Sequence, residues 1–353
     1  MSRSKTESDL CGPEAGSSKG KDTMDTTRRT FLEGLGAVAA LGAVGMRAGT
    51  SACTVTAQAG PATKCLFWIA AATPCDKNLK FDEDLYKDMM AYFKANGADG
   101  IVVLGSTGEY PSFSVAERKK VAETALKHRN GLNIIVCSGT SNFPETIELS
   151  QHAAEYGADG LLIIPPFYYK QPPLEGLTRY FSLIFEQVSI PINLYHYPRM
   201  SAVPVTPELL HSLEKYPNLA GIKDSNGDAA EYEQYVKEFP KLNMRTGTGN
   251  NLKAALESRM GAILMEGNLF TKAIADVFTA KRAGKDIDAL LTRLHDMQQV
   301  LRPAGVGSFG PMKYALSLQM GTRQSYQRPP HPDVTEEQKA KIREGLQQIK
   351  QMA

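Results

Sequence analysis

The chain has 353 residues, which allows one large domain or two. Lys and Arg together number 40 and Asp and Glu 38, so the net charge is +2, and 42% of the residues are hydrophobic. This balance predicts a soluble globular protein and disfavours nucleic acid as a partner. No apolar stretch approaches the roughly 20 residues that cross a bilayer, so we expect no membrane span.

Residues 1–59 have the features of an export signal and leader rather than of a fold. Thr27-Arg28-Arg29-Thr30-Phe31-Leu32 precedes a short Gly- and Ala-rich apolar run, Gly34 to Gly45. Paired arginines before such a run resemble a twin-arginine signal, and Ala57-Gln58-Ala59 offers a small-residue cleavage site. Lipidation at Cys53 is the poorer alternative. We therefore expect a periplasmic or secreted protein, or a cytoplasmic one if the leader is not functional.

From residue 65 onward, apolar runs bounded by Gly or Pro alternate with amphipathic segments of helical period. Strands of a parallel sheet are buried on both faces and therefore form continuous apolar runs. Gly-Ala-Asp-Gly recurs at 97–100 and 157–160, each time between a helix and a strand, which indicates equivalent βα units. We expect eight strands: Cys65–Thr73, Gly100–Gly105, Asn133–Ser138, Gly160–Pro165, Ile192–Tyr197, Leu219–Lys223, Leu242–Thr246 and Ala262–Glu266.

Eight βα units predict an α/β protein with a (β/α)8 TIM barrel, which we place at residues 60–284. A doubly wound open sheet is the alternative. Three additional C-terminal helices are expected at 286–302, 308–320 and 335–351, forming an extension over residues 285–353 that packs on the barrel. The cysteines after the leader form no CxxC motif, so we expect Cys65, Cys75 and Cys137 to be buried free thiols.

In a barrel of this kind, the residues at the C-terminal ends of the strands form the active site. Lys223 is the strongest candidate, because it ends the apolar strand expected at Leu219–Lys223, where burying an ammonium is costly. Desolvation favours the neutral, nucleophilic amine; the alternative is a lysine that reaches solvent or pairs with Asp224. The other candidates at strand ends are Thr73, Gly105-Ser106-Thr107-Gly108-Glu109, Ser138, Phe167-Tyr168-Tyr169 and Tyr195.

Two of these candidates suggest distinct roles. Ser106 and Thr107 lie between glycines, in a turn whose backbone N–H groups and hydroxyls can bind a carboxylate, although it could also be a simple tight turn. Tyr195 ends the strand before the lysine strand, so its phenol can relay protons in the same pocket or merely fill the core.

The Gly105–Glu109 motif, Tyr195 and Gly221-Ile222-Lys223 together resemble the dihydrodipicolinate synthase/N-acetylneuraminate lyase family of class I aldolases, over roughly residues 65–350. The resemblance implies that Lys223 forms a Schiff base with a 2-oxo acid such as pyruvate, and that Tyr195 relays protons. It implies no metal and no organic cofactor. It also implies a homotetramer or homodimer in which one tyrosine reaches a neighbouring subunit.

The same resemblance supplies the rest of the expected site. Thr107 with Tyr168 or Tyr169 would complete the hydroxyl relay, and Ser106 with Thr107 would hold the substrate carboxylate. The remaining residues expected to bind substrate are Gly105, Thr73, Met200, Ser225, Gly249, Asn250 and Asn251.

Three positions bear on which family member this chain resembles. Met200 stands where the synthases have an arginine for the carboxylate of the aldehyde substrate, with Arg199 one residue early. Gly249-Asn250-Asn251 stands near the Asp-Glu pair with which the lyases bind sugar hydroxyls, and Asn can still hydrogen-bond a polyol. His196 replaces the usual Asn after the tyrosine and is expected to be a satisfied hydrogen-bonding residue rather than a catalyst.

We therefore expect cleavage of a hydroxylated 2-oxo (sugar) acid with release of pyruvate. Export favours cleavage, because the synthase reaction uses cytoplasmic aspartate semialdehyde. The alternatives are dihydrodipicolinate synthase, a sugar-acid dehydratase that uses the same lysine, and a catalytically silent exported 2-oxo-acid-binding protein.

Overall fold

The computed structural model describes residues 64–352. The predicted leader, with the paired arginines, Cys53 and Ala57-Gln58-Ala59, lies outside the described residues, and so does the predicted barrel boundary at residue 60. Within the described part of the chain, every helix is too short or too polar to cross a membrane.

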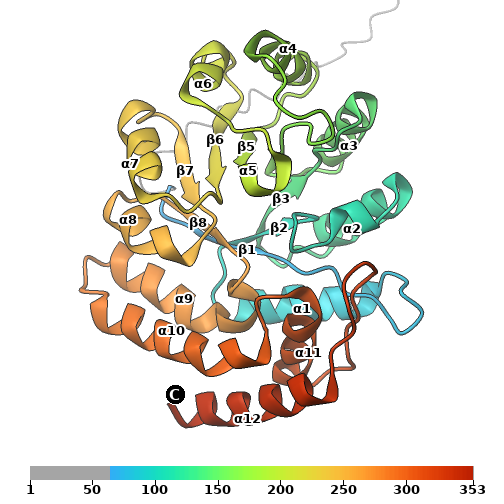
Figure 1. Ribbon diagram of the computed structural model, residues 1–353, viewed down its shortest axis with the longest axis vertical. Coiled ribbons are helices and arrows are strands. Elements are labelled where there is room, and N and C mark those ends of the chain that lie inside the picture. Colours follow the sequence, from blue (N-terminus) through green and yellow to red (C-terminus); the bar gives the residue numbers. More distant parts are fainter. Residues whose placement is uncertain (1–63, 353) are drawn as a thin grey trace, which may run out of the picture. The chain divides into compact units, whose positions relative to one another are not determined.

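Eight parallel strands form a closed barrel in the order β1 to β8, with β8 pairing back onto β1 (Figure 1). The strands are β1 (Phe67–Ala70), β2 (Gly100–Val103), β3 (Asn133–Cys137), β4 (Gly160–Ile163), β5 (Ile192–His196), β6 (Leu219–Asp224), β7 (Asn243–Thr246) and β8 (Ala262–Leu264). The predicted TIM barrel is confirmed, and closure excludes the open-sheet alternative. Most predicted strands ran slightly past the observed ends, because those terminal residues already turn into the loops above the barrel.

Helices follow the strands around the outside of the barrel. They are α1 (Glu83–Ala95), α2 (Val115–Lys127), α3 (Phe143–Glu155), α4 (Leu174–Phe185), α5 (Pro198–Ser201), α6 (Pro207–Leu213), α7 (Ala229–Glu238), α8 (Leu252–Glu257) and α9 (Gly267–Arg282). Side-chain caps fix several starts: Ser114 and Glu117 form a capping box on α2, and Thr206 caps α6 with Pro207 at its first position. Two short 3-10 segments in the loops, η2 (Tyr110–Ser112) and η3 (Gly249–Asn251), lie near the expected site.

The three predicted C-terminal helices are present as α10 (Asp288–Leu301), α11 (Phe309–Met320) and α12 (Glu336–Met352), with the 3-10 segment η4 (Arg302–Ala304) after α10. α10 and α11 both pack against α9, and α12 packs against α10 and α11. In Figure 1 these helices gather on one side of the barrel, beside α9 and α1.

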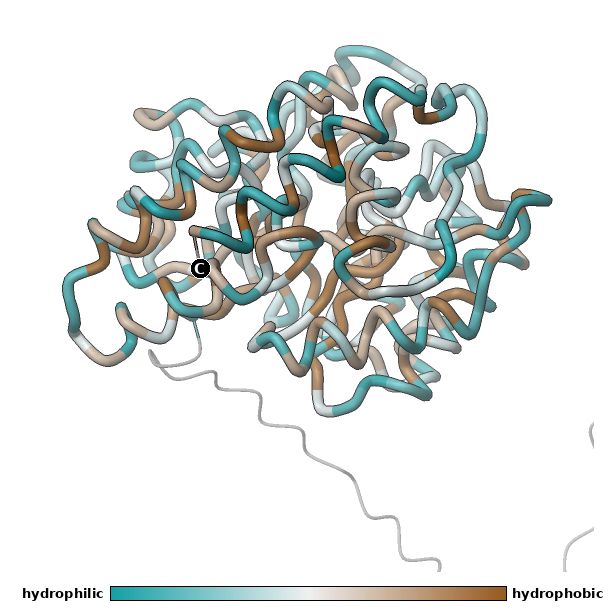
Figure 2. The backbone as a smooth tube through the Cα atoms, turned by 90° about the horizontal axis from the view of Figure 1, so that it is seen from below, coloured by the Kyte–Doolittle hydropathy of each residue, from teal (hydrophilic) through white to brown (hydrophobic). Residues whose placement is uncertain are grey.

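The core consists of the barrel interior and the layer between the strands and the helices. Hydrophobic and hydrophilic positions alternate along the outer helices (Figure 2), and the buried apolar residues of these helices belong to the core. Inside the barrel, the buried Arg245 of β7 reaches Asn193 of β5 and lies over the ring of Trp68, 4.5 Å from its centroid. Cys65, Cys75 and Cys137 are buried free thiols, as predicted.

Candidate active site

Lys223 and Tyr195 meet at the C-terminal end of the barrel. They are register partners on β6 and β5, so both side chains point to the same face of the sheet. Lys223 is 4% exposed and Tyr195 2% exposed, and Lys223 Nζ lies 3.4 Å from the Tyr195 hydroxyl oxygen. The lysine therefore neither reaches solvent nor pairs with Asp224; an amine and a phenol share a buried site, within reach for proton transfer.

A glycine directly after the next strand makes room for Lys223. Gly247 follows β7, and a Cβ built on it would lie 2.9 Å from Lys223 Cε and 2.0 Å from Ser225 Oγ. Any side chain at position 247 would displace both residues. Ser225, which was expected to bind substrate, is buried and directly follows β6, the strand that carries Lys223.

The Gly105–Glu109 motif forms the loop after β2 in an unusual backbone conformation. Leu104 (φ 59°), which precedes the motif, and Glu109 (φ 54°), its last residue, both adopt the left-handed region, where side chains are disfavoured. Such strain persists only when the surroundings enforce it, and it concentrates at functional loops. Ser106 is half-buried and Thr107 is buried, and both belong to this loop at the C-terminal end of the barrel.

Thr73 lies against this motif. A Cβ on Gly108 would lie 3.1 Å from Thr73 Oγ1, so the glycine lets the loop after β1 approach the loop after β2. The Thr73 hydroxyl is completely buried and has no hydrogen-bond partner among the described residues. A buried hydroxyl without a partner is costly, which suits a group that binds a ligand.

Glu109 has a structural explanation. Its carboxylate forms a buried ion pair with Lys313 of α11 and accepts a hydrogen bond of 2.9 Å from the Arg328 backbone N–H. These contacts hold the strained end of the motif loop against the C-terminal helices. Ser138 is likewise structural: its buried hydroxyl accepts a hydrogen bond of 2.8 Å from Ser150 of α3, which lies outside the barrel.

The structure places three other candidates at the protein surface. Tyr168 and Tyr169, in the loop after β4, are 74% and 72% exposed, and their rings pack edge to face with each other. Met200 in α5 is 61% exposed, while the Arg199 guanidinium lies 5.8 Å from the centre of the Tyr197 ring. These positions give the three side chains no part in the buried contact between Lys223 and Tyr195.

The residues of the expected polyol-binding segment after β7 differ in their exposure to solvent. Gly249 and Asn250 are exposed, and Asn250 lines a cavity of about 610 Å³. Asn251 is 2% exposed, and its side-chain amide contacts the Asp228 carbonyl oxygen at 3.4 Å. Asn251 therefore supports the loop from below, whereas Asn250 is accessible to a ligand.

Two residues near the site were missed in the sequence. Tyr110, directly after the motif, is buried and packs edge-on against Phe167, which links the loops after β2 and β4; burial raises its pKa. Glu266 follows β8, and burial raises the pKa of its carboxyl, an effect that its own backbone N–H and then the positive charge of Lys223 partly offset. The sequence signal for Glu266 was a charged residue at the end of an apolar strand.

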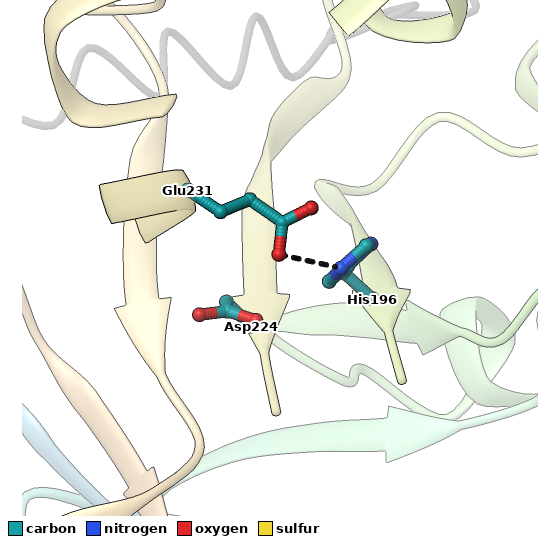
Figure 3. Close-up of side chains that lie close together, drawn as sticks. All are labelled: His196, Asp224 and Glu231. Atoms are coloured by element: carbon teal, nitrogen blue, oxygen red, sulfur yellow. Dashed lines mark ion pairs between the residues drawn. The ribbon is translucent and has the colours of Figure 1, made fainter. Parts of the chain in front are cut away.

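His196, Asp224 and Glu231 form a cluster on the outer face of the same two strands (Figure 3). His196 and Asp224 are register partners and almost completely buried, and His196 Nε2 lies 3.4 Å from Glu231 Oε2 of α7 without hydrogen-bond geometry. Burial lowers the pKa of His196 and raises that of Asp224 to about 6. One ligating atom from each residue lies within 4.8 Å of the others.

The tautomer of His196 argues against a metal in this cluster. The Val205 backbone N–H donates to His196 Nδ1 at 3.1 Å, so the proton of the neutral ring sits on Nε2, facing Glu231. A metal bound at Nε2 would need the lone pair there and would normally have the other ring nitrogen donating instead. The expectation of a satisfied hydrogen-bonding histidine therefore holds at one ring nitrogen only: Nδ1 accepts from Val205, whereas Nε2 is buried without a hydrogen-bond partner among the described residues.

Comparisons with known proteins agree with this geometry. A model described as "Dihydrodipicolinate synthetase family" matches residues 67–349. The chain is 32% identical over 292 residues to 4-hydroxy-tetrahydrodipicolinate synthase of Coxiella burnetii, covering 80% of this chain and 96% of that relative. It is 31% identical over 265 residues to an "Uncharacterized DapA-like lyase" of Chloroflexus aurantiacus, covering 74% of this chain and 88% of that relative.

The fold has matches among solved structures as well. YagE, a prophage protein from E. coli K12 solved in complex with pyruvate, matches with a TM-score of 0.75 at 26% identity, over 80% of this chain and 98% of that one. A family match over most of the described residues, with relatives above 30% identity, settles the classification. The chain belongs to the dihydrodipicolinate synthetase family of lyases.

Proposed function

We propose that the protein is a class I Schiff-base aldolase that cleaves a hydroxylated 2-oxo acid, such as a sugar acid, into pyruvate and an aldehyde. The observation that carries the proposal is the buried Lys223–Tyr195 pair at the C-terminal end of a closed barrel. The pyruvate bound to the structurally similar YagE supports a 2-oxo acid as ligand.

The residues supply each step of such a cleavage. The Lys223 amine adds to the C2 carbonyl, and loss of water gives a protonated imine that withdraws electrons from the C3–C4 bond. The C4 hydroxyl gives its proton to a base as that bond breaks, which releases the aldehyde and leaves an enamine. The enamine takes a proton at C3, and water then hydrolyses the imine to free pyruvate and Lys223.

Tyr195 would move these protons, and the support for this role is its hydroxyl, which lies 3.4 Å from Lys223 Nζ. Ser106, Thr107 and the unpartnered hydroxyl of Thr73 would bind the carboxylate of the 2-oxo acid. The exposed Tyr168 and Tyr169 support an oligomer in which these tyrosines complete the hydroxyl relay of a neighbouring subunit.

Borohydride trapping with pyruvate on the full chain, read by peptide mass spectrometry, tests the proposal. We expect one reduced adduct per chain on Lys223, no adduct in Lys223→Ala, and an unchanged adduct in Lys253→Ala, which removes an exposed lysine of α8. Lys223→Ala should also lose all measurable turnover. An adduct on another lysine, or none with pyruvate, would contradict the assignment.

Condensation of pyruvate with an aldehyde, as a 4-hydroxy-tetrahydrodipicolinate synthase, is the second candidate, because relatives such as the Coxiella protein carry that name. Against it, the side chain at the position expected to bind the carboxylate of that aldehyde is the exposed thioether of Met200. A thioether cannot pair with a carboxylate. A dehydratase would form the same lysine adduct but release no aldehyde, so product analysis separates all three reactions.

We propose further that the paired Arg28 and Arg29 direct export of the protein. The support is the sequence pattern alone: two arginines followed by a short apolar run and a small-residue cleavage site. Cell fractionation should find the wild-type protein outside the cytoplasm and the Arg28→Lys/Arg29→Lys double variant inside it. Equal distribution of the two proteins would contradict the proposal.

A further inference from the structure

Glu266 occupies a distinctive position among the residues at the strand ends. It lies between β8 and the first residue of α9, Gly267, and therefore at the same end of the barrel as Lys223. A Cβ built on Gly249 would lie 3.7 Å from Glu266 Oε1, so the carboxylate leans against the loop after β7. This separation is an ordinary van der Waals contact, so the loop after β7 and the Glu266 carboxylate lie side by side.

The carboxylate is electrostatically coupled to the Schiff-base lysine. Burial raises the pKa of Glu266, while the positive charge of Lys223 acts in the opposite direction. Both groups also stand at the C-terminal mouth of the barrel, Lys223 near the end of β6 and Glu266 two residues after the end of β8. A substrate that is joined to Lys223 and extends beyond the imine carbons has to pass this mouth, where Glu266 stands.

Glu266, but not Lys223, lines a cavity of about 610 Å³. One part of its wall is polar, with Asn250 after β7, Gln298 and Gln299 at the end of α10, and Arg302 of η4. The other part is apolar and comes largely from α9 and α11. The volume lies within the range of small-molecule sites, so the cavity can hold a ligand of several carbon atoms.

This wall chemistry suits one kind of ligand. A carboxylate accepts hydrogen bonds from hydroxyls, and side-chain amides both donate and accept them, whereas the apolar part of the wall can contact the carbon chain. Glu266 offsets the positive charge of Arg302 in the same wall, so the cavity offers no surplus of positive charge to attract a carboxylate. Polyhydroxylated carbon chains satisfy both conditions.

Resting on the function proposed above, the geometry points to this cavity as the subsite for a hydroxylated substrate tail, with Glu266 as the residue that selects tails bearing hydroxyls. The chemical class of substrate is thus a 4-hydroxy-2-oxo acid with further hydroxyls beyond C4. This assigns the recognition of the polyol to the end of the eighth strand and the end of α10.

The test compares two substrates that undergo the same bond cleavage. One is a six-carbon 2-oxo acid with hydroxyls on C4, C5 and C6; the other is a five-carbon 4-hydroxy-2-oxo acid that ends in a methyl group. We expect wild type to prefer the first by kcat/KM, and Glu266→Ala to lower that preference about 10- to 100-fold, as loss of a hydrogen bond to a charged group predicts. Glu266→Gln, which is nearly isosteric and still accepts a hydrogen bond, should keep part of the preference.

The ratio of the two substrates separates selection from a general effect on Lys223, because losing the charge near the lysine affects both cleavages alike. Glu257→Ala, an exposed carboxylate at the end of α8, is the matched control and should leave the ratio unchanged. Turnover of both substrates with a ratio that Glu266→Ala and Glu266→Gln do not change would overturn the inference. Failure of wild type to form a pyruvate adduct would instead overturn the proposed aldolase function.

Discussion

The inner and outer faces of β5 and β6 carry two contrasting pairs of side chains. Tyr195 and Lys223 point into the barrel, and the next residues along each strand, His196 and Asp224, point out toward α7. All four are almost completely buried. The inner pair faces the site loops, whereas the outer pair is enclosed by Val205 and Glu231.

This contrast shows that burial of a titratable group does not by itself mark a catalytic residue. Side chains alternate between the two faces of a strand, so neighbours in sequence enter different environments. Only the face that opens to the C-terminal end of the barrel can meet a substrate. The outer face can instead affect stability and how stability depends on pH.

The largest effect should come from the inner pair. Tyr195→Phe removes the hydroxyl that lies 3.4 Å from Lys223 Nζ and should lower kcat about 10²- to 10⁴-fold, the usual size of a proton-transfer contribution. The melting temperature should change little, because the ring that packs on Tyr197 is retained. Steady-state kinetics with detection of pyruvate measures the loss.

Tyr197→Phe is the matched control for this variant, since its ring stacks on Tyr195 but belongs to a half-buried residue outside the lysine contact. Its kcat should stay within a few-fold of wild type. Equal losses in the two variants would mean that aromatic packing, rather than the Tyr195 proton, supports turnover.

A smaller effect is expected from the outer pair, and on stability rather than chemistry. The pKa of Asp224 is raised from an ordinary 3.8 to about 6, chiefly by burial, with the charges of Glu231 and Asp228 acting in the same direction. The folded state therefore binds the proton more tightly than the unfolded state. The stability that this proton contributes is present below pH 4 and is lost as the pH rises through about 6, amounting to about 2–3 kcal/mol.

Asp224→Asn removes that loss, because an amide stays neutral and its oxygen can still accept from the Asn226 backbone N–H. We expect the variant to be more stable than wild type at pH 8 by about 1–3 kcal/mol and nearly equal to it at about pH 3.5, where the carboxyl is protonated in both the folded and the unfolded state. Urea unfolding at both pH values measures the difference. A variant less stable than wild type at pH 8 would show that the ionised carboxylate is stabilised by its neighbours.

The sequence alone determined the fold and the central pair of the site. Eight apolar runs separated by helical patterns specify a parallel barrel because strands of that sheet must be buried on both faces. Lys223 and Tyr195 were predictable because each ends such a strand, and the barrel brings all strand ends together. The three C-terminal helices were also expected from the sequence, within a few residues of their observed bounds.

Tertiary structure decided which of the remaining polar residues face the site. Asn250 and Asn251 are adjacent in sequence, yet one lines the cavity and the other supports the loop, because η3 turns between them. Glu109 shares a motif with Thr107 but pairs with Lys313, a residue of α11 far away in the sequence. Glu266 becomes a candidate for substrate binding only in the folded chain, which brings it to the same end of the barrel as Lys223 and into one cavity wall with the end of α10. Loop direction and contacts between distant segments leave no periodic trace in a sequence, so only the folded chain could decide them.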